Sequence, residues 1–292
     1  MKRWAHLALI VAGLGLVLAV LAWLRPLALP DEGRYGDVGR FMMRSGDWLA
    51  PRLDGIPFFH KPPLLHWLQA ATLSVAGVHP WVSRWVPMGH ALLMLGVMAW
   101  ATRRCLGEAV AWRATLLLGT SLGFLIGGQY INHDMLAACW ISIAIWCFGL
   151  SFLHGTRPQK SLAFGGFLAC GMGVMSKGLI GLVCPGLVMV VWLSLTRQWR
   201  KAWHLPWFTG LLGLGVLIEM IYHLQLNAAL GPQLKFMGVM LNAHGVESWF
   251  GAGFVMLTGV FLFEVARRQY LREWSDIQEY IEKEIRRREN LA

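Results

Sequence analysis

A charged and polar run, Asp31–Tyr35 (DEGRY), follows the first hydrophobic stretch, and a further basic residue, Lys61, lies downstream in the same polar segment. Paired carboxylates such as Asp31 and Glu32 can act as a general base, bind a metal or orient a hydroxyl group. The planar guanidinium of Arg34 suits a phosphate or a carboxylate. The segment therefore offers two cations to a phosphate and a carboxylate to a nucleophile, an arrangement that fits a phosphorylated lipid at a membrane interface.

A purely structural interpretation of the two carboxylates competes with this one. Acidic side chains are favoured at a helix N-terminus, and an interfacial helix beginning near Gly36 would place Asp31 and Glu32 there. For the two acids alone, helix capping would be the better interpretation. The neighbouring Arg34 favours the binding interpretation, because its guanidinium suits a phosphate.

The elements that position these residues are hydrophobic helices. Of the 292 residues, 56% are hydrophobic and only 14% are charged, whereas a soluble domain carries about a quarter charged residues. The mean hydropathy is +0.50. Because a spanning helix needs about 20 apolar residues, the sequence predicts an all-α polytopic membrane protein with about eight transmembrane helices. The candidate spans are 4–24, 81–101, 109–128, 134–153, 161–176, 178–195, 205–226 and 250–266.

Between the first two spans, the amphipathic segment 62–77 is expected to lie along the interface. We expect one transmembrane domain over 1–266, with its first external loop at 25–80, and a charged cytoplasmic helical tail over 267–292. The first span resembles a signal peptide but has a long apolar run and no cleavage site, so a retained signal anchor is predicted.

The distribution of Lys and Arg predicts the orientation. Basic residues are concentrated in alternate loops, which places the N-terminus in the cytoplasm and the loop 25–80 on the periplasmic side of a bacterial inner membrane. Asp134, Lys177 and His244 then fall on that same periplasmic face. The net charge of +10 comes mainly from the ends of apolar spans, which favours anionic phospholipids as partners and argues against nucleic acid. The five cysteines form no C-x-x-C pair, so neither a zinc site nor a disulfide framework is indicated.

Several motifs in this external loop resemble a known family of membrane enzymes. They are Asp31-Glu32-x-Arg34-Tyr35, Gly46-Asp47-Trp48-x-x-Pro51-Arg52 and Phe59-x-Lys61-Pro62-Pro63. These residues resemble the first external loop of bacterial polyprenyl-phosphate-dependent glycosyltransferases of the GT-C fold, a group that includes the ArnT and protein mannosyltransferase families. The resemblance covers residues 1–245, with weaker matches at Asp134 and at Ser176-Lys177-Gly178. Such relatives usually continue with further helices, so a short variant, a truncated product or a subunit is expected.

The resemblance implies roles for the loop residues. Asp31 would be the catalytic carboxylate near the acceptor, with Glu32 among the residues that bind substrate. Arg34, Tyr35 and Lys61 would surround the phosphate of the donor lipid, and Lys61 would stabilise the charge on the leaving group. Inversion at the anomeric carbon is also implied.

Two residues outside the loop complete the implied pocket. Asp134 would be its second acidic residue, and Lys177 a cation that faces the same cavity. The resemblance also implies a metal held near His60 and His244. At His60 the family often has Glu, so a metal-binding imidazole and a polar interfacial position both stay open. The residues require no particular cofactor, and a divalent metal is the one candidate.

The predicted function is an integral membrane glycosyltransferase. Its donor would be a polyprenyl-phosphate-linked sugar, and its acceptor a lipid such as lipid A, another glycan or a protein at the periplasmic face. The alternatives are a transporter or flippase, or a non-catalytic subunit, for a lipid-linked anionic substrate. The intramembrane acid Glu219 would suit a transporter, although a structural pairing of Glu219 with His223 one turn later is favoured.

Overall fold

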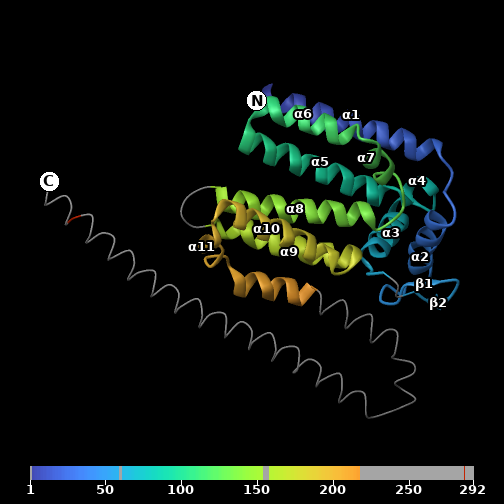
Figure 1. Cartoon of the computed structure of the whole chain (residues 1–292). Helices are drawn as coiled ribbons and strands as arrows, with labels where there is room; N and C mark the ends of the chain where they lie inside the picture. Colours follow the sequence, from blue (N-terminus) through green and yellow to red (C-terminus); the bar gives the residue numbers. More distant parts are fainter. Residues whose placement is uncertain (1, 59–60, 154–157, 218–285, 287–292) are drawn as a thin grey trace, which may run out of the picture. The chain divides into compact units, whose positions relative to one another are not determined.

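The computed structural model describes residues 2–58, 61–153, 158–217 and 286 (Figure 1). Helices dominate this part of the chain. They are α1 Lys2–Leu24, α2 Asp31–Ser45, α3 Leu64–Ala76, α4 Pro80–Ser83, α5 Trp85–Leu106, α6 Glu108–Gly119, α7 Leu122–Gly127, α8 Asp134–Leu153, α9 Lys160–Lys177, α10 Ile180–Thr196 and α11 Trp199–Ala202. A further apolar helix spans Trp207–Leu217. The predicted span 250–266 and nearly all of the predicted tail lie outside the described residues.

The predicted membrane helices are present wherever the structure describes them. Three helical segments are long and apolar enough to cross a membrane: His6–Leu24, Pro80–Leu106 and Asp134–Leu153. The predicted all-α polytopic membrane fold is thus confirmed. The predicted span 109–128 differs, because it is divided into α6 and α7. The hydroxyl of Ser121 accepts a hydrogen bond from the Phe124 N–H and starts a new helix there.

The long helices pack through an apolar core. One cluster joins α1, α5, α7 and α8 around Leu18, Leu95 and Phe124, all buried. The α9–α10 hairpin is packed most closely: a Cβ on Gly181 would lie 2.1 Å from the Gly173 carbonyl carbon. Backbones can approach this closely only where both helices carry glycine, as is typical of membrane helix pairs.

The shorter elements gather at one end of the bundle, where α2, α3 and a small hairpin lie together (Figure 1). The hairpin pairs β1 Arg52–Leu53 with β2 Ile56–Pro57 in antiparallel register. Its turn residues, Asp54 and Gly55, have φ values of 52° and 81°, as a tight two-residue hairpin requires. Helix α2 packs on α3 with Gly39 against the side chain of Gln69. The same end holds the start of α8 and the end of α9, so five segments converge there.

Candidate active site at one end of the helix bundle

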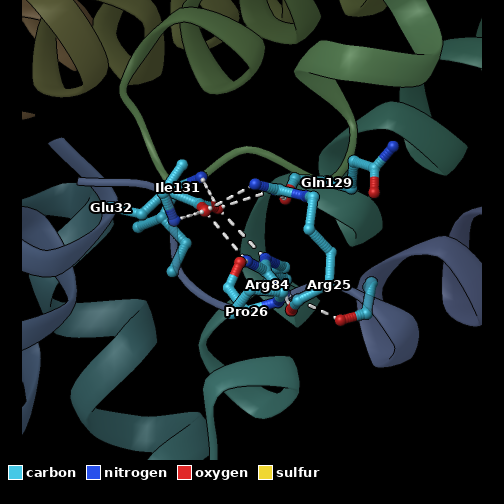
Figure 2. A network of polar contacts seen from close by, with 8 residues as sticks. Arg25, Pro26, Glu32, Arg84, Gln129 and Ile131 are labelled. Carbon is cyan, nitrogen blue, oxygen red and sulfur yellow. Dashed lines mark hydrogen bonds and ion pairs between the residues drawn. The ribbon is translucent and has the colours of Figure 1, made fainter. Parts of the chain in front are cut away.

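The carboxylate of Glu32 is the centre of a buried polar network (Figure 2). Glu32 has no exposed side-chain surface and accepts six hydrogen bonds. Arg25 donates two of them at 2.9 and 3.1 Å, and Arg84 donates two at 3.0 and 2.8 Å. The other two come from the backbone N–H groups of Ala28 at 2.7 Å and Ile131 at 3.1 Å. An ionised carboxylate has about four acceptor positions, so protein groups saturate Glu32.

The guanidinium of Arg84 links this network to the first helix. Arg84 is fully buried and donates to the backbone carbonyls of Ala22, Arg25 and Pro26 at 2.6 to 2.8 Å. Arg25 also donates to the carbonyl of Gln129 at 3.0 Å. The network therefore joins the end of α1, the first turn of α2, the start of α5 and the loop before α8. The sequence had not been used to predict a role for Arg84, although a charged residue within an apolar span indicates a functional or ion-paired position.

The protonation state of Glu32 follows from these contacts. Burial on its own would raise the pKa of this carboxyl. Hydrogen bonds from Arg84, the Ala28 N–H, Arg25 and the Ile131 N–H outweigh burial and lower the pKa from 4.5 to about 2. Glu32 is therefore ionised at neutral pH and fully occupied by protein donors, so the structure places it beneath the surface that its neighbour Asp31 occupies.

Asp31 itself lies in the first turn of α2 and is partly exposed. The helix begins at Asp31 rather than near Gly36, because Ala28 and Pro30 supply carbonyls to the first N–H groups of the helix. Arg34 donates to the Asp31 carboxylate at 2.7 Å, and both side chains are about 40% exposed. The guanidinium of Arg34 also lies over the ring of Tyr35, 4.8 Å from its centroid. A carboxylate and a cation are thus held side by side at the edge of the site.

Tyr35 connects this pair to a buried pair of histidines. The ring of Tyr35 lies 4.9 Å from that of His133 and 6.2 Å from that of His66, and the two imidazoles are 5.3 Å apart. Burial is the main reason that the pKa of His133 falls from 6.5 to about 3, and the positive charges of Lys61 and Lys177 lower it further. Both lysines therefore act electrostatically on one buried imidazole.

Asp134 and Lys177 meet where α8 begins and α9 ends. Lys177 forms an ion pair with the Asp134 carboxylate, whose second oxygen accepts a hydrogen bond from the Asn132 side chain at 3.0 Å. Lys177 is the last residue of α9, and Gly178 follows with a φ of 81°, which starts the turn into α10. Figure 1 shows that this turn lies near the end of the bundle that carries α2 and α3.

Most of the site residues that the sequence predicted thus interact with one another at one end of the bundle. A chain of interactions runs from Asp31 through Arg34, Tyr35 and His133 to the two lysines and Asp134. Tyr130 belongs to the same region and was missed: burial raises its pKa, and the charges of Asp31 and Glu32 raise it further. Its position in the loop before α8 gave no periodic signal.

The expected metal ligands His60 and His244, and the polar pair Glu219 and His223, lie outside the described residues. Within the part of the chain that the structure describes, no group of three or more His, Cys, Asp or Glu side chains could hold a metal ion.

The chain is similar to curated proteins and to a solved structure. Curated relatives include undecaprenyl phosphate-alpha-4-amino-4-deoxy-L-arabinose arabinosyl transferases from Edwardsiella ictaluri (31% identity; 63% of this chain, 35% of the relative) and Pseudomonas fluorescens strain Pf0-1 (32% identity; 68% and 35%). A crystal structure of ArnT from Cupriavidus metallidurans bound to undecaprenyl phosphate superimposes with a TM-score of 0.70 at 27% identity, over 75% of this chain and 41% of that one. The chain spans about a third of the length of these curated relatives.

A protein-family model also matches the part of the chain that contains most of the site. The model of the family described as dolichyl-phosphate-mannose-protein mannosyltransferase matches residues 27–229, a range that includes Asp31, Lys61, Asp134 and Lys177. The helical membrane fold, the clustered charges and this match agree with one another. The chain therefore belongs to the dolichyl-phosphate-mannose-protein mannosyltransferase (PMT) family.

Proposed function

We propose that this chain carries the catalytic face of a membrane glycosyltransferase that moves a sugar from a polyprenyl phosphate to an acceptor outside the cytoplasm. The named relatives are arabinosyl transferases that use undecaprenyl phosphate, and the structural neighbour binds that lipid. The observation that carries the proposal is that Lys61 and Lys177 both act on His133, whose ring contacts Tyr35 beside the partly exposed Asp31–Arg34 pair. Cations beside a carboxylate suit a phosphate leaving group next to a nucleophile.

The charge balance of the reaction explains why cations are needed. A sugar phosphodiester carries one negative charge, and cleavage of its anomeric C–O bond leaves a phosphate monoester with a second negative charge. Lys61 and Arg34 would stabilise that developing charge more strongly than the charge of the bound donor, which lowers the barrier. The attacking acceptor atom forms the new bond to the anomeric carbon from the opposite face, which inverts the configuration.

The proton of the acceptor needs a base within reach. The Asp31 carboxylate is partly exposed beside Arg34, so it would accept the proton of an attacking hydroxyl or amine. If the acceptor is itself a phosphate, its oxygen is already deprotonated, and Asp31 would mainly orient it. Tyr35, Asp134 and Lys177 would complete the binding surface. A lipid such as lipid A, a glycan or a protein would be the acceptor.

A transfer assay tests the proposal. Purified full-length chain in liposomes receives polyprenyl phosphate carrying radiolabelled aminoarabinose, together with lipid A, and transferred label is counted. The isosteric variant Asp31→Asn and the variant Lys61→Gln should each lose at least about a hundredfold in rate, as expected when a group that orients the acceptor or one that stabilises the leaving group is removed. Wild-type activity from Asp31→Asn would contradict the role given to that carboxylate.

The chain offers a matched control on the same helix. Asp37 pairs with Arg40 at the same i,i+3 spacing as Asp31 and Arg34, and is also partly exposed. Asp37→Asn removes an equivalent surface ion pair outside the proposed site and should leave the transfer rate unchanged. If the donor lipid crosses the liposome membrane with its sugar–phosphate bond intact, the transporter alternative replaces the proposal.

The orientation is part of the proposal. With the N-terminus in the cytoplasm, the site faces the periplasm, and the basic ends of the helices face the cytoplasmic leaflet. A cysteine introduced at the exposed Ile56 in the hairpin should react with a membrane-impermeant maleimide added outside intact spheroplasts. Reaction only after the membrane is permeabilised would reverse the assigned orientation.

A further inference from the structure

An apolar cavity of about 210 Å³ lies between α8, α9, α10 and the segment that follows α10. Apolar groups provide almost all of its surface, and the lining residues include Phe152, Phe167, Gly186, Met189, Trp199 and Trp207. The volume is several times the ~30 Å³ that a water molecule occupies in the liquid, and apolar cavities of this kind stay dry and bind apolar molecules. The cavity therefore suits a segment of hydrocarbon chain rather than a polar ligand.

The cavity extends to the end of the bundle opposite the candidate active site. Helix α8 begins at Asp134 and ends at Leu153, so Phe152 is displaced from Asp134 by about 27 Å along the axis. Figure 1 shows α11 at this far end and α2 with α3 at the other. A separation close to the thickness of the hydrocarbon core, about 30 Å, places the cavity mouth at the other membrane interface.

The mouth of the cavity is basic. Lys201 donates from Nζ to the carbonyl of Phe152 at 3.4 Å, and its sequence neighbours in α11, Trp199 and Ala202, both line the cavity. Arg197 and Lys160 are exposed at the same end of the bundle. The sequence contains no Asp or Glu between Asp134 and Glu219, so this stretch supplies no acid to neutralise them.

From these observations we propose that the cavity binds one acyl chain of an anionic phospholipid, whose phosphate lies at Lys201 and the neighbouring basic residues. An apolar cavity beneath a cationic rim matches the two parts of such a lipid: the chain fills the dry space, and the headgroup meets the ammonium. Each Lys or Arg side chain near an anionic lipid surface adds its own electrostatic attraction. The proposal does not depend on the transferase activity, because the basic residues at the cavity mouth lie at the other end of α8 from the residues assigned to catalysis.

Photolabelling of the full-length chain in nanodiscs tests the proposal. One preparation contains phosphatidylglycerol with a diazirine in its acyl chain, and another contains the matching phosphatidylcholine. We expect phosphatidylglycerol to label the peptides that contain Met189 and Trp207 about fivefold more strongly, which corresponds to one basic side chain at an anionic surface. Lys201→Gln should remove this preference without lowering the labelling by phosphatidylcholine.

A glycine in the cavity wall allows the space to be filled without a clash. A Cβ on Gly186 would meet nothing within 4 Å, so Gly186→Phe should fill the cavity and reduce labelling by phosphatidylglycerol at least fivefold. Gly96→Phe on α5 is the matched control, because a Cβ there also meets nothing, and it should leave the labelling unchanged. Equal labelling by the two lipids, or unchanged labelling in Gly186→Phe, overturns the proposal. Displacement of the label by polyprenyl phosphate would assign the cavity to the donor lipid instead.

Discussion

Replacing Glu32 by Gln separates a structural role for this carboxylate from a role in binding substrate. The substitution keeps the size of the side chain but removes its charge and presents an NH2 group to the guanidinium groups of Arg25 and Arg84. In the folded chain those two groups and two backbone N–H groups all donate to Glu32. The variant therefore leaves at least one buried donor facing another donor.

The magnitude follows from two independent considerations. The pKa of Glu32 is lowered from 4.5 to about 2, and one pKa unit corresponds to about 1.4 kcal/mol, so the contacts contribute about 3 kcal/mol at neutral pH. Breaking a buried ion pair by removing one partner costs about 3–5 kcal/mol. At about 2–4 °C per kcal/mol, a loss of about 3 kcal/mol should lower the unfolding midpoint of Glu32→Gln by about 6–12 °C.

The assay is thermal unfolding in detergent followed by tryptophan fluorescence, with the transfer rate measured on the same samples below the transition. Asp37→Asn is the control, because an exposed ion pair contributes only about 0–1 kcal/mol. The double variant Glu32→Gln/Arg84→Gln should be less destabilised than the sum of its single variants, since both partners of the ion pair are removed. If Glu32→Gln keeps its unfolding temperature but loses transfer, Glu32 contacts substrate and the structural assignment is wrong.

Three further predictions follow from other parts of the site. The pKa values of His66 and His133 are lowered from 6.5 to about 3, mainly by burial, so both imidazoles are neutral when folded, and unfolding at lower pH takes up protons. The free energy of unfolding is then highest above about pH 6.5, and below that pH each histidine lowers it by up to about 1.4 kcal/mol per pH unit. Unfolding temperatures measured from pH 7.5 to 5.5 should show this decrease, and His133→Gln should make it smaller. Gly181→Ala would place a methyl group 2.1 Å from the Gly173 backbone, so it should separate α9 from α10 and weaken donor binding through Lys177, seen as a raised KM, whereas Gly186→Ala should not. If a divalent metal is bound through His60, metal analysis of the purified wild type should find about one ion per chain and His60→Ala should lose it; equal metal content in both would remove His60 as a ligand.

The helical part of the fold could be predicted from the sequence because its signal is local. Lipid offers no partners to backbone N–H and C=O groups, so apolar runs such as 4–24 and 134–153 must be helical wherever they are embedded. The division of the predicted span 109–128 at Ser121 was missed, although Thr120 and Ser121 interrupt the apolar run and Ser is a residue type that caps helices. The two-residue hairpin at Asp54-Gly55 was also missed, since two-residue strands give too short a pattern.

The candidate site could be described only from the sequence and the tertiary structure together. The sequence by itself determined which residue types the polar loop contains, and its charge asymmetry predicted that Asp31, Lys61, Asp134 and Lys177 share one membrane face. Only the tertiary structure separated the two adjacent acids: Asp31 stays at the surface with Arg34, while Glu32 is buried among donors from segments up to 99 residues away. Adjacent residues on a helix point in directions about 100° apart, so neighbours in sequence can face solvent and core. Which of the two faces the core depends on where Arg84 and Ile131 pack, and no local pattern contains that information.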